Sequence, residues 1–467
     1  MYKELIDAYL EGKENEMLED LKALIRIDSQ KSAALPGKPF GEGPARALAL
    51  GQELMEKYGL SVKNYDNYVV TGDYGSGEKA LDILAHLDVV PVTDEWTVTK
   101  PFDPIVEDGK IYGRGSADDK GPAVAALYAI RAVKALGIPL KKSLRLVLGS
   151  DEECGSSDLE HYYSIETEAP YTFTPDGSFP VINLEKARLA KKFKAKAPLM
   201  ETLPRICAIH AGDKVNVVPA RAEALVEGIH EEILERMADR AAEQTNALFV
   251  WEQEGDRTLI RVKGTAAHAS TPEAGNNALT ALLQLLSMLP MADSLGFQMV
   301  CGLHEMFPHG DTAGTALQVS MEDEESGALT MNLGILNYQD GQISGSFDSR
   351  APLCADDENL TEVLRRKFAA LGFEMEEGGM TPAHYVSPDS EFVRTLLDSY
   401  ERYTGIKGKP LAIGGGTYVH ELERGVAFGC DMPGVDNHMH GDDEFMEINT
   451  MVMSAKIFAD VIVKLCC

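Results

Sequence analysis

The sequence predicts an α/β protein in which a doubly wound domain is interrupted by an inserted α+β domain. Between about residues 80 and 180, apolar runs of strand length alternate with one helix of regular period, which is the pattern of a βαβ layer. From residue 188 to residue 382, charged amphipathic helices are mixed with strands of alternating polarity. At 467 residues the chain is too long for one ordinary hydrophobic core. We therefore expect residues 1–187 and 383–467 to form one domain and residues 188–382 to be the insertion.

The first domain is predicted from its strands and from the helix between two of them. The helix spans Ala123–Leu136 with apolar residues at steps of three and four; Pro122 suits its first turn, and Gly137 ends it. The strand candidates are LDILAHL at 81–87, SLRLVLGS at 143–150 and YTFT at 171–174.

The insertion and the residues after it have their own periodic patterns. The helices expected in the insertion are 231–249, 277–290 and 359–373, and the strands are 258–264 and 341–352. The segments expected after it are a helix at 390–405, strand edges in 411–418 and 426–430, and a closing helix at 450–465. The first domain is therefore expected to resume after the insertion.

Charge and cysteine usage exclude several classes of function. Lys plus Arg number 44 and Asp plus Glu 74, so the net charge is 44 − 74 = −30, which repels phosphate backbones and anionic membranes. We therefore expect no nucleic-acid partner and no membrane partner. The N-terminal segment is charged and helical in period, unlike a signal peptide. Seven scattered cysteines without a C-x-x-C spacing favour reduced thiols and a cytoplasmic location.

Histidines and acids recur where the predicted strands end. In an open α/β sheet the carboxyl ends of strands share one crevice, which is where metal sites form. Any one of these residues has an ordinary structural explanation, such as a hydrogen-bonded core histidine, an acid at a helix N-terminus or a turn aspartate. The full set is hard to explain that way. It consists of His86, Asp88, Asp118, Asp119, Asp151, Glu152, Glu153, Asp176, His440, Asp443 and Glu444.

Two spacings within this set are informative. His86 and Asp88 are two residues apart and face the same way on a strand, so Asp88 can fix the tautomer of the His86 ring while the ring's other nitrogen binds metal. Three adjacent acids, Asp151 to Glu153, repel one another unless cations compensate. In the run VDNHMHGDDEF, His438 is a rival to His440.

The motifs HLDVVP, YGRGSADDKGP, SDEECGSSD, TPDGSFPV and HGDDEF resemble those of the di-zinc metallopeptidases related to aminoacylase and carboxypeptidase G. The resemblance is strongest to the PepV-type Xaa-His dipeptidases, which are carnosinase-like, and it covers almost the whole chain. It implies a catalytic domain that holds two divalent metal ions. Zinc is the first expectation for both ions, and such ligands also bind manganese or cobalt. It also implies that the insertion is a lid over the substrate.

Carried over residue by residue, the resemblance implies roles in the first domain. His86 and Asp176 would complete one metal site, Glu153 and His440 the other, and Asp118 would bridge the two. Glu152 would be the general base, and Asp88 the partner of His86. A cis peptide between Asp118 and Asp119 is also implied.

In the lid, the resemblance implies that His268 reaches the scissile carbonyl, Asn216 orients substrate and Arg350 takes the substrate carboxylate. The residues expected to hold the substrate's C-terminal end are Gly414, Gly415, Gly416 and Thr417. The ordinary alternatives are a turn or cap histidine, a surface arginine on a strand and a tight glycine turn.

The expected activity is metal-dependent hydrolysis of unblocked dipeptides, in which a hydroxide that bridges the metals attacks and Glu152 takes its proton. The alternative is an amidohydrolase of N-acyl amino acids, either a deacetylase or a desuccinylase. A third hypothesis is a non-catalytic acidic protein that binds metal. Asp443 stands where the family usually has asparagine, which leaves its structural role open. The large insertion is compatible with a working monomer and leaves a homodimer open.

Overall fold

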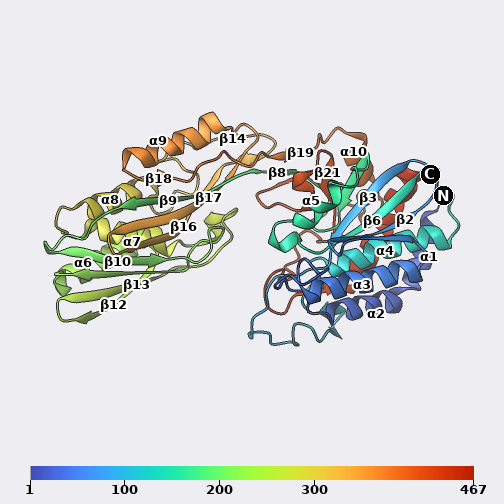
Figure 1. Ribbon diagram of the computed structural model, residues 1–467, viewed down its shortest axis with the longest axis horizontal. Coiled ribbons are helices and arrows are strands. Elements are labelled where there is room, and N and C mark those ends of the chain that lie inside the picture. The colour runs from blue at the N-terminus through green and yellow to red at the C-terminus, as the bar shows by residue number, and fades with distance from the viewer. Residues whose placement is uncertain (1) are drawn as a thin grey trace. The chain divides into compact units, whose positions relative to one another are not determined.

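A computed structural model describes residues 2–467, which form two compact units (Figure 1). Unit 1 comprises the chain up to Leu184 together with His384–Leu411 and Gly416–Cys467, and unit 2 comprises Glu185–Ala383 and Ala412–Gly415. The chain thus changes unit beside the domain boundaries expected at 187/188 and 382/383. The sequence pattern does not indicate the return of residues 412–415 to unit 2.

The main sheet of unit 1 has the strand order β1-β2-β6-β3-β7-β21-β8-β19. Strand β3 is parallel to both β6 and β7, and β21 is parallel to β7, so the centre of this sheet has the predicted α/β character. The strands are β1 (Ser61–Tyr65), β2 (Val69–Tyr74), β3 (Lys79–His86), β6 (Ser143–Gly149), β7 (Tyr171–Thr174), β8 (Ile182–Glu185), β19 (His384–Tyr385) and β21 (Gly425–Ala427). Strand β20 (Leu411–Ile413) lies where the chain passes from unit 1 to unit 2.

Helices of unit 1 cover this sheet and supply most of its core. Helices α4 and α11 pack against each other and against β3. Along β3 the side chains of Ile83 and Ala85 enter the main core, whereas Leu84 enters a smaller cluster with Val147 and Tyr418, so both faces of the strand are buried. The helices are α1 (Lys3–Glu11), α2 (Glu14–Ile25), α3 (Glu42–Lys57), α4 (Lys120–Ala135), α5 (Ser157–Tyr163), α10 (Glu391–Thr404) and α11 (Ile448–Cys466).

The predicted βαβ unit is confirmed. The three strand candidates are β3, β6 and β7, and the predicted helix is α4, which begins at Lys120 rather than Ala123. The earlier start places Pro122 within the first turn, where its missing N–H costs nothing. A small sheet completes unit 1 in the order β22-β5-β4, with β4 at Ile105–Glu107, β5 at Lys110–Tyr112 and β22 at Phe445–Glu447.

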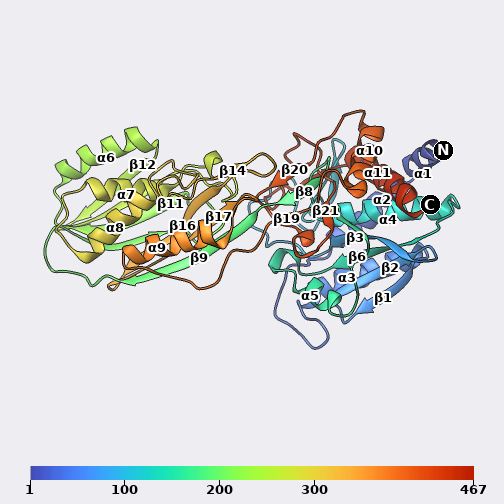
Figure 2. The ribbon, with the colours of Figure 1, turned by 90° about the horizontal axis from the view of Figure 1, so that it is seen from above.

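Unit 2 is an eight-stranded antiparallel sheet in the order β12-β13-β11-β10-β16-β17-β9-β18, with four helices packed on it (Figure 2). On β9 the side chains of Leu189 and Phe193 are buried while those of Lys192 and Lys194 are exposed, so only one face of the sheet lies under the helices. The strands are β9 (Ala187–Lys196), β10 (Arg205–Ala211), β11 (Arg221–Glu227), β12 (Leu248–Glu254), β13 (Arg257–Lys263), β16 (Thr330–Gln339), β17 (Gln342–Ala351) and β18 (Glu374–Met375), beside a hairpin of β14 (Glu322–Asp323) and β15 (Gly327–Ala328).

Unit 2 contains one helix, α8, that the sequence pattern did not predict, and helices α7 and α9 are shorter than expected. Helix α6 ends at Thr245 rather than at Phe249, because Asn246 adopts a left-handed conformation with φ 54° and stops the helix. Leu248 and Phe249 then open strand β12. The helices are α6 (Glu231–Thr245), α7 (Ala278–Met288), α8 (Leu295–Met306) and α9 (Glu362–Ala370). Across residues 2–467, the structure contains no helix with both the length and the apolar character needed to cross a membrane.

Candidate metal centre

Five side chains of unit 1 gather at the carboxyl end of its sheet. His86 is the last residue of β3, Glu153 lies in the turn after β6, and Asp176 follows β7. Asp118 precedes α4, and His440 lies in the loop before β22. Because β3, β6 and β7 are parallel, their carboxyl ends meet at one edge, which explains why residues so far apart in the sequence converge.

The five side chains form two triads that share Asp118. In the first, Nε2 of His86 lies 3.0 Å from Oδ1 of Asp118 and 3.6 Å from Oδ2 of Asp176. In the second, Nε2 of His440 lies 2.7 Å from Oδ2 of Asp118 and 3.3 Å from Oε1 of Glu153. The ligand atoms within each triad lie within 4.8 Å of one another. Asp118 therefore presents one oxygen to each triad, as a carboxylate that bridges two cations must.

The ligand atoms of the two triads are better suited to bind divalent cations than to form hydrogen bonds with one another. Nε2 of His86 and Oε1 of Glu153 are buried, and neither has a hydrogen-bond partner among the described residues. Leaving such polar atoms unpaired in a protein interior costs about 1–3 kcal/mol each. Imidazole nitrogen with carboxylate oxygen is the ligand set of zinc, and manganese and cobalt accept it too.

The ionisation of these groups reflects the crowding of negative charge. Burial, together with the charge of Asp118, raises the pKa of Glu153 to about 7 and also raises the pKa of Asp176. The nearby carboxylates of Asp118 and Glu153 raise the pKa of His440 to about 11. Cations at the two triads would relieve the repulsion between the carboxylates.

Glu152 belongs to neither triad. It lies beside Glu153 at the start of the turn after β6 and is only partly exposed. Burial, with the negative charges of Asp176 and Glu153, raises the pKa of Glu152 well above its ordinary value. A raised pKa suits a carboxylate that must accept a proton near neutral pH and then release it.

Asp88 contacts both the first triad and the turn that carries Glu152. Nδ1 of His86 lies 3.1 Å from the Asp88 backbone oxygen and 3.4 Å from Oδ1 of its carboxylate. The same carboxylate accepts the backbone N–H groups of Glu152 at 3.3 Å and Glu153 at 3.2 Å. Strand β3 ends at His86, so Asp88 reaches the ring from the loop and not through the strand period that the sequence suggests.

A second buried carboxylate, Asp158, anchors the start of this turn. Its Oδ2 accepts the backbone N–H groups of Ser150 at 2.6 Å and Asp151 at 3.0 Å, and the Tyr418 hydroxyl at 2.5 Å. A side chain at Gly149 would place its Cβ 2.0 Å from that hydroxyl, which explains the glycine. Asp158 ends the motif SDEECGSSD, but nothing in the sequence pattern indicates that it binds Tyr418.

Asp119 also points toward the first triad. Its Oδ2 accepts the backbone N–H of His86 at 3.0 Å, and its buried Oδ1 has no hydrogen-bond partner among the described residues. The peptide bond between Asp118 and Asp119 is cis, which confirms that expectation.

The loop before β22 distinguishes between the two rival histidines and explains Asp443. His438 interacts through Nδ1 with the Asp442 carbonyl at 3.2 Å and joins neither triad. Asp443 has a positive φ of 57°, and its carboxylate accepts the N–H groups of Thr97 at 2.9 Å and Val98 at 2.8 Å and the Thr97 hydroxyl at 2.6 Å. Three donors therefore suit a carboxylate at a position where the family usually has an amide.

In unit 2, Ser270 contacts the Nδ1 atom of His268 with two groups. Its backbone N–H donates to Nδ1 at 3.2 Å, and its hydroxyl lies 2.6 Å from the same atom. A neutral imidazole that accepts at Nδ1 carries its proton on Nε2. Asn216 is a neighbour, because its carbonyl accepts the N–H of Ala269 at 2.9 Å and Val217 forms a β-bridge with His268. In that tautomer His268 can act as a hydrogen-bond donor through Nε2.

Arg350 is not a surface arginine. Its side chain is 6% exposed, and its guanidinium donates to Asp348 at 2.7 and 3.2 Å and to the Gly414 carbonyl. A Cβ at Gly414 would lie 2.7 Å from the Ser270 side chain. The structure thus brings Arg350, Gly414 and the His268 loop together within unit 2.

The remaining predicted substrate residues are divided between the units. Gly415 belongs to unit 2, whereas Gly416 and Thr417 belong to unit 1, as do all the residues of the two triads. The meeting of His268, Asn216 and Arg350 with the triads stays a prediction.

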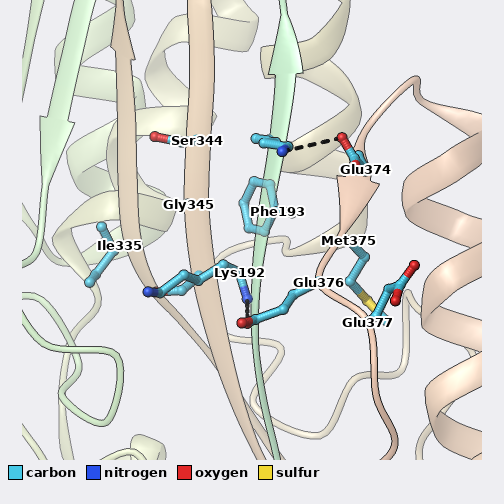
Figure 3. A pocket seen from close by; sticks show the side chains of 11 residues that line it. Lys192, Phe193, Ile335, Ser344, Gly345, Glu374, Met375, Glu376 and Glu377 are labelled. Carbon is cyan, nitrogen blue, oxygen red and sulfur yellow. Dashed lines mark hydrogen bonds and ion pairs between the residues drawn. The ribbon is translucent and has the colours of Figure 1, made fainter.

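A cavity of about 480 Å³ elsewhere in unit 2 offers no comparable set of ligands (Figure 3). Its lining residues include Lys192, Ile335, Ser344 and Glu374, without a histidine, and Lys194 pairs with Glu374 at 3.5 Å. The charged groups there are arranged as ordinary cross-strand pairs on a sheet surface.

Comparison with known proteins finds a matching family and relatives similar over almost the whole chain. The model of a family described as peptidase family M20/M25/M40 matches residues 83–464. The chain is 36% identical over 462 residues to the protein YtjP of Bacillus subtilis (strain 168), across 97% of this chain and 98% of that protein. It is 32% identical over 475 residues to a Beta-Ala-Xaa dipeptidase of Lactobacillus delbrueckii subsp. lactis, across 99% of this chain and 98% of that protein.

Among solved structures, the fold is similar to that of human carnosine dipeptidase 1, with a TM-score of 0.61 at 15% identity over 100% of this chain and 99% of that chain. At that identity the likeness concerns the fold alone.

Proposed function

Because this chain belongs to peptidase family M20/M25/M40 and is a hydrolase, we propose that it is a dinuclear metal-dependent dipeptidase that cleaves unblocked dipeptides. The observation that carries the proposal is the sharing of Asp118 between two triads while Glu152 stays outside both. The similarity to a Beta-Ala-Xaa dipeptidase over almost the full length of both chains supports a dipeptide as substrate.

The metal sites of this proposal use the five converged side chains. His86 and Asp176 would hold one ion, Glu153 and His440 would hold the other, and Asp118 would contribute to both sites. A bound pair of divalent ions lowers the pKa of water toward neutrality and polarises a peptide carbonyl. Zinc is the first expectation for both positions, with manganese and cobalt as alternatives.

Glu152 is the general base in this mechanism. Its carboxylate takes a proton from the attacking water and passes that proton to the leaving amine. The crowded, buried surroundings that raise the pKa of Glu152 make the proton easier to hold between these two steps. Asp88 orients the His86 ring. It also orients the turn that carries the base, because its carboxylate accepts the N–H groups of Glu152 and Glu153.

The lid residues bind and orient the substrate. His268 donates from Nε2 to the oxyanion, Arg350 binds the free carboxylate, and Asn216 orients the peptide. Gly414, Gly415, Gly416 and Thr417 line the place of the substrate's C-terminal end. Asp348 holds Arg350 from the side, which reduces the entropy lost when the guanidinium binds a carboxylate.

The choice between a dipeptide and an N-acyl amino acid depends on the substrate's amino end. Oδ1 of Asp119 is buried beside the first triad without a hydrogen-bond partner among residues 2–467, and it can accept from a charged amine. An acyl group offers no such donor. This contrast supports the dipeptide.

A substrate panel tests the proposal. The purified protein is loaded with zinc, manganese or cobalt and assayed on dipeptides that include β-Ala-His, beside N-acetyl and N-succinyl amino acids. We expect hydrolysis of the dipeptides and little hydrolysis of the acylated compounds. The reverse preference would identify an amidohydrolase, and no hydrolysis with any metal would favour a non-catalytic metal-binding protein.

A further inference from the structure

A buried carboxylate that the mechanism leaves unused, Glu444, lies just behind the bridging aspartate. Its Oε1 accepts the backbone N–H groups of Ala117 at 2.8 Å and Asp118 at 3.2 Å. Its Oε2 accepts the N–H of Gly115 at 3.2 Å and the guanidinium of Arg114 at 2.5 Å. The residue is 0% exposed. One side chain therefore binds three N–H groups of the segment that ends in Asp118.

Arg114 links the same site to the loop of His440. Its guanidinium donates to the carbonyl of Gly441 at 2.9 Å, directly after His440 in the chain. The guanidinium also lies 5.4 Å from the centre of the Trp96 ring, and Arg114 is 2% exposed. The main chain adds one more link, since the N–H of Gly113 donates to the Glu444 carbonyl at 3.0 Å.

Two segments that are distant in sequence, Gly113–Asp118 and His440–Glu444, are thus joined by one ion pair and its hydrogen bonds. Each segment ends or begins with a residue of the second triad. The ordinary explanation is a buried ion pair that only stabilises the fold. Buried ion pairs are weak stabilisers because the cost of desolvation offsets the attraction between the charges. In addition, the Glu444 carboxylate of this pair accepts the N–H of Asp118, which a purely stabilising pair does not need to do.

We infer that Glu444, held by Arg114, is a positioning residue that sets the separation of Asp118 and His440 for the metal pair. The inference rests on the metal pair proposed above. The physical reason is geometric. Asp118 must present one oxygen to each ion, so a small rotation of its backbone moves both ligand atoms, and the carboxylate of Glu444 prevents that rotation by binding the N–H groups of two successive residues.

The test measures metal binding and not turnover. Glu444→Gln keeps the shape of the side chain but places an amide NH₂ against N–H donors. The affinity for zinc is measured by competition with a chromophoric chelator, and the number of ions per chain by elemental analysis after dialysis. The matched control is Glu447→Gln, three residues along, whose carboxylate accepts a bond from the Thr450 hydroxyl at 3.4 Å.

We expect Glu444→Gln to weaken zinc binding by about 10- to 100-fold, as removal of a group behind a metal ligand typically does. Glu447→Gln should bind zinc like the wild type. Arg114→Lys should also weaken binding, because a lysine cannot reach Glu444 and the Gly441 carbonyl together. Circular dichroism and the melting temperature of the metal-free proteins show whether each variant folds.

Wild-type zinc affinity in a folded Glu444→Gln variant, with a loss only in melting temperature, would overturn the inference and leave a purely structural ion pair. If Glu444→Gln does not fold, Arg114→Lys decides in the same way. A wild-type protein that binds no pair of ions would instead refute the proposed function, so the two failures are distinguishable.

Discussion

Nε2 of His440 lies 2.7 Å from Oδ2 of Asp118, although the two residues come from opposite parts of the chain. The other oxygen of the same carboxylate lies 3.0 Å from Nε2 of His86. One aspartate thus faces two imidazoles, and each imidazole has a further carboxylate beside it. This arrangement has direct consequences for metal loading, turnover and stability.

Glu152→Gln should keep both metals and lose turnover. The side chain lies in neither triad, so its removal leaves the ligands in place, whereas loss of a general base typically costs about 10² to 10⁴ in kcat. The comparison variant is Glu153→Gln, one residue along, which should lose metal as well as activity. Elemental analysis measures the metal content, and steady-state kinetics measures kcat. A near-normal kcat in Glu152→Gln would exclude Glu152 as the general base.

Chelation should silence the enzyme reversibly. Dialysis against EDTA removes the ions, and the buried, unpaired Nε2 of His86 and Oε1 of Glu153 are then left among repelling carboxylates. Activity should return on addition of zinc, manganese or cobalt, and the melting temperature should rise with metal concentration because the metal binds only the folded state. Full activity after exhaustive chelation would contradict the mechanism.

His268→Ala should lower kcat by about 10² to 10³ without altering metal content, as expected for one lost oxyanion donor. His210→Ala is the control, since His210 is an exposed histidine of the same unit that contacts Asn337. Equal kcat in the two variants would show that His268 does not reach the reacting carbonyl.

Asp443→Ala should destabilise the loop before β22 by about 1 kcal/mol, because three donors from Thr97 and Val98 lose their acceptor. Asp443→Asn should cost less, because an amide oxygen still accepts the two N–H groups and the amide NH₂ can donate to the Thr97 hydroxyl. Urea unfolding of the metal-loaded proteins measures the difference. Equal stability of the alanine and asparagine variants would indicate that these bonds contribute nothing.

Asp82 should make the protein less stable as pH rises. It is 0% exposed on β3; its Oδ1 has no hydrogen-bond partner in the described chain, and Oδ2 lies 3.1 Å from Lys79. Burial raises the pKa of Asp82 to about 6, from 3.8 in the unfolded chain. Its contribution to stability is therefore fully present below pH 3.8 and is lost as pH rises through about 6.

Asp82→Asn avoids the cost of a buried charge, and Lys79 keeps its bond to the Thr167 carbonyl at 2.9 Å. We expect the variant to gain on the order of 2 kcal/mol relative to wild type between pH 5 and pH 8. Thermal melts of the metal-free proteins across this range measure the gain, with the exposed Asp239→Asn as control. A difference between variant and wild type that does not change with pH would contradict the prediction.

Much of the fold and the candidate site could be predicted from local patterns. Apolar runs such as 81–87 and 143–150 must be buried, so they become strands, and a helix between them makes the strands parallel. Parallel strands end at one edge of a sheet, and the polar residues after each strand were therefore expected to meet there. His86, Asp118, Glu153, Asp176 and His440 do meet in this way.

Other relationships depend on distances between backbone and side chains that no spacing contains. The spacing of residues does not distinguish His440 from His438; the family resemblance indicated His440, and the structure places that residue in the second triad. Nor does the spacing indicate that Asp88 binds the turn of Glu152, that Asp443 binds Thr97, or that Glu444 binds the N–H of Asp118.

By itself, then, the sequence determined which residue types stand at the ends of which strands, because burial of apolar side chains and the geometry of parallel sheets are local and general. Only the tertiary structure decided how each ligand is held, because a hydrogen bond forms or fails over a few tenths of an ångström. Those distances arise when segments far apart in the chain pack together.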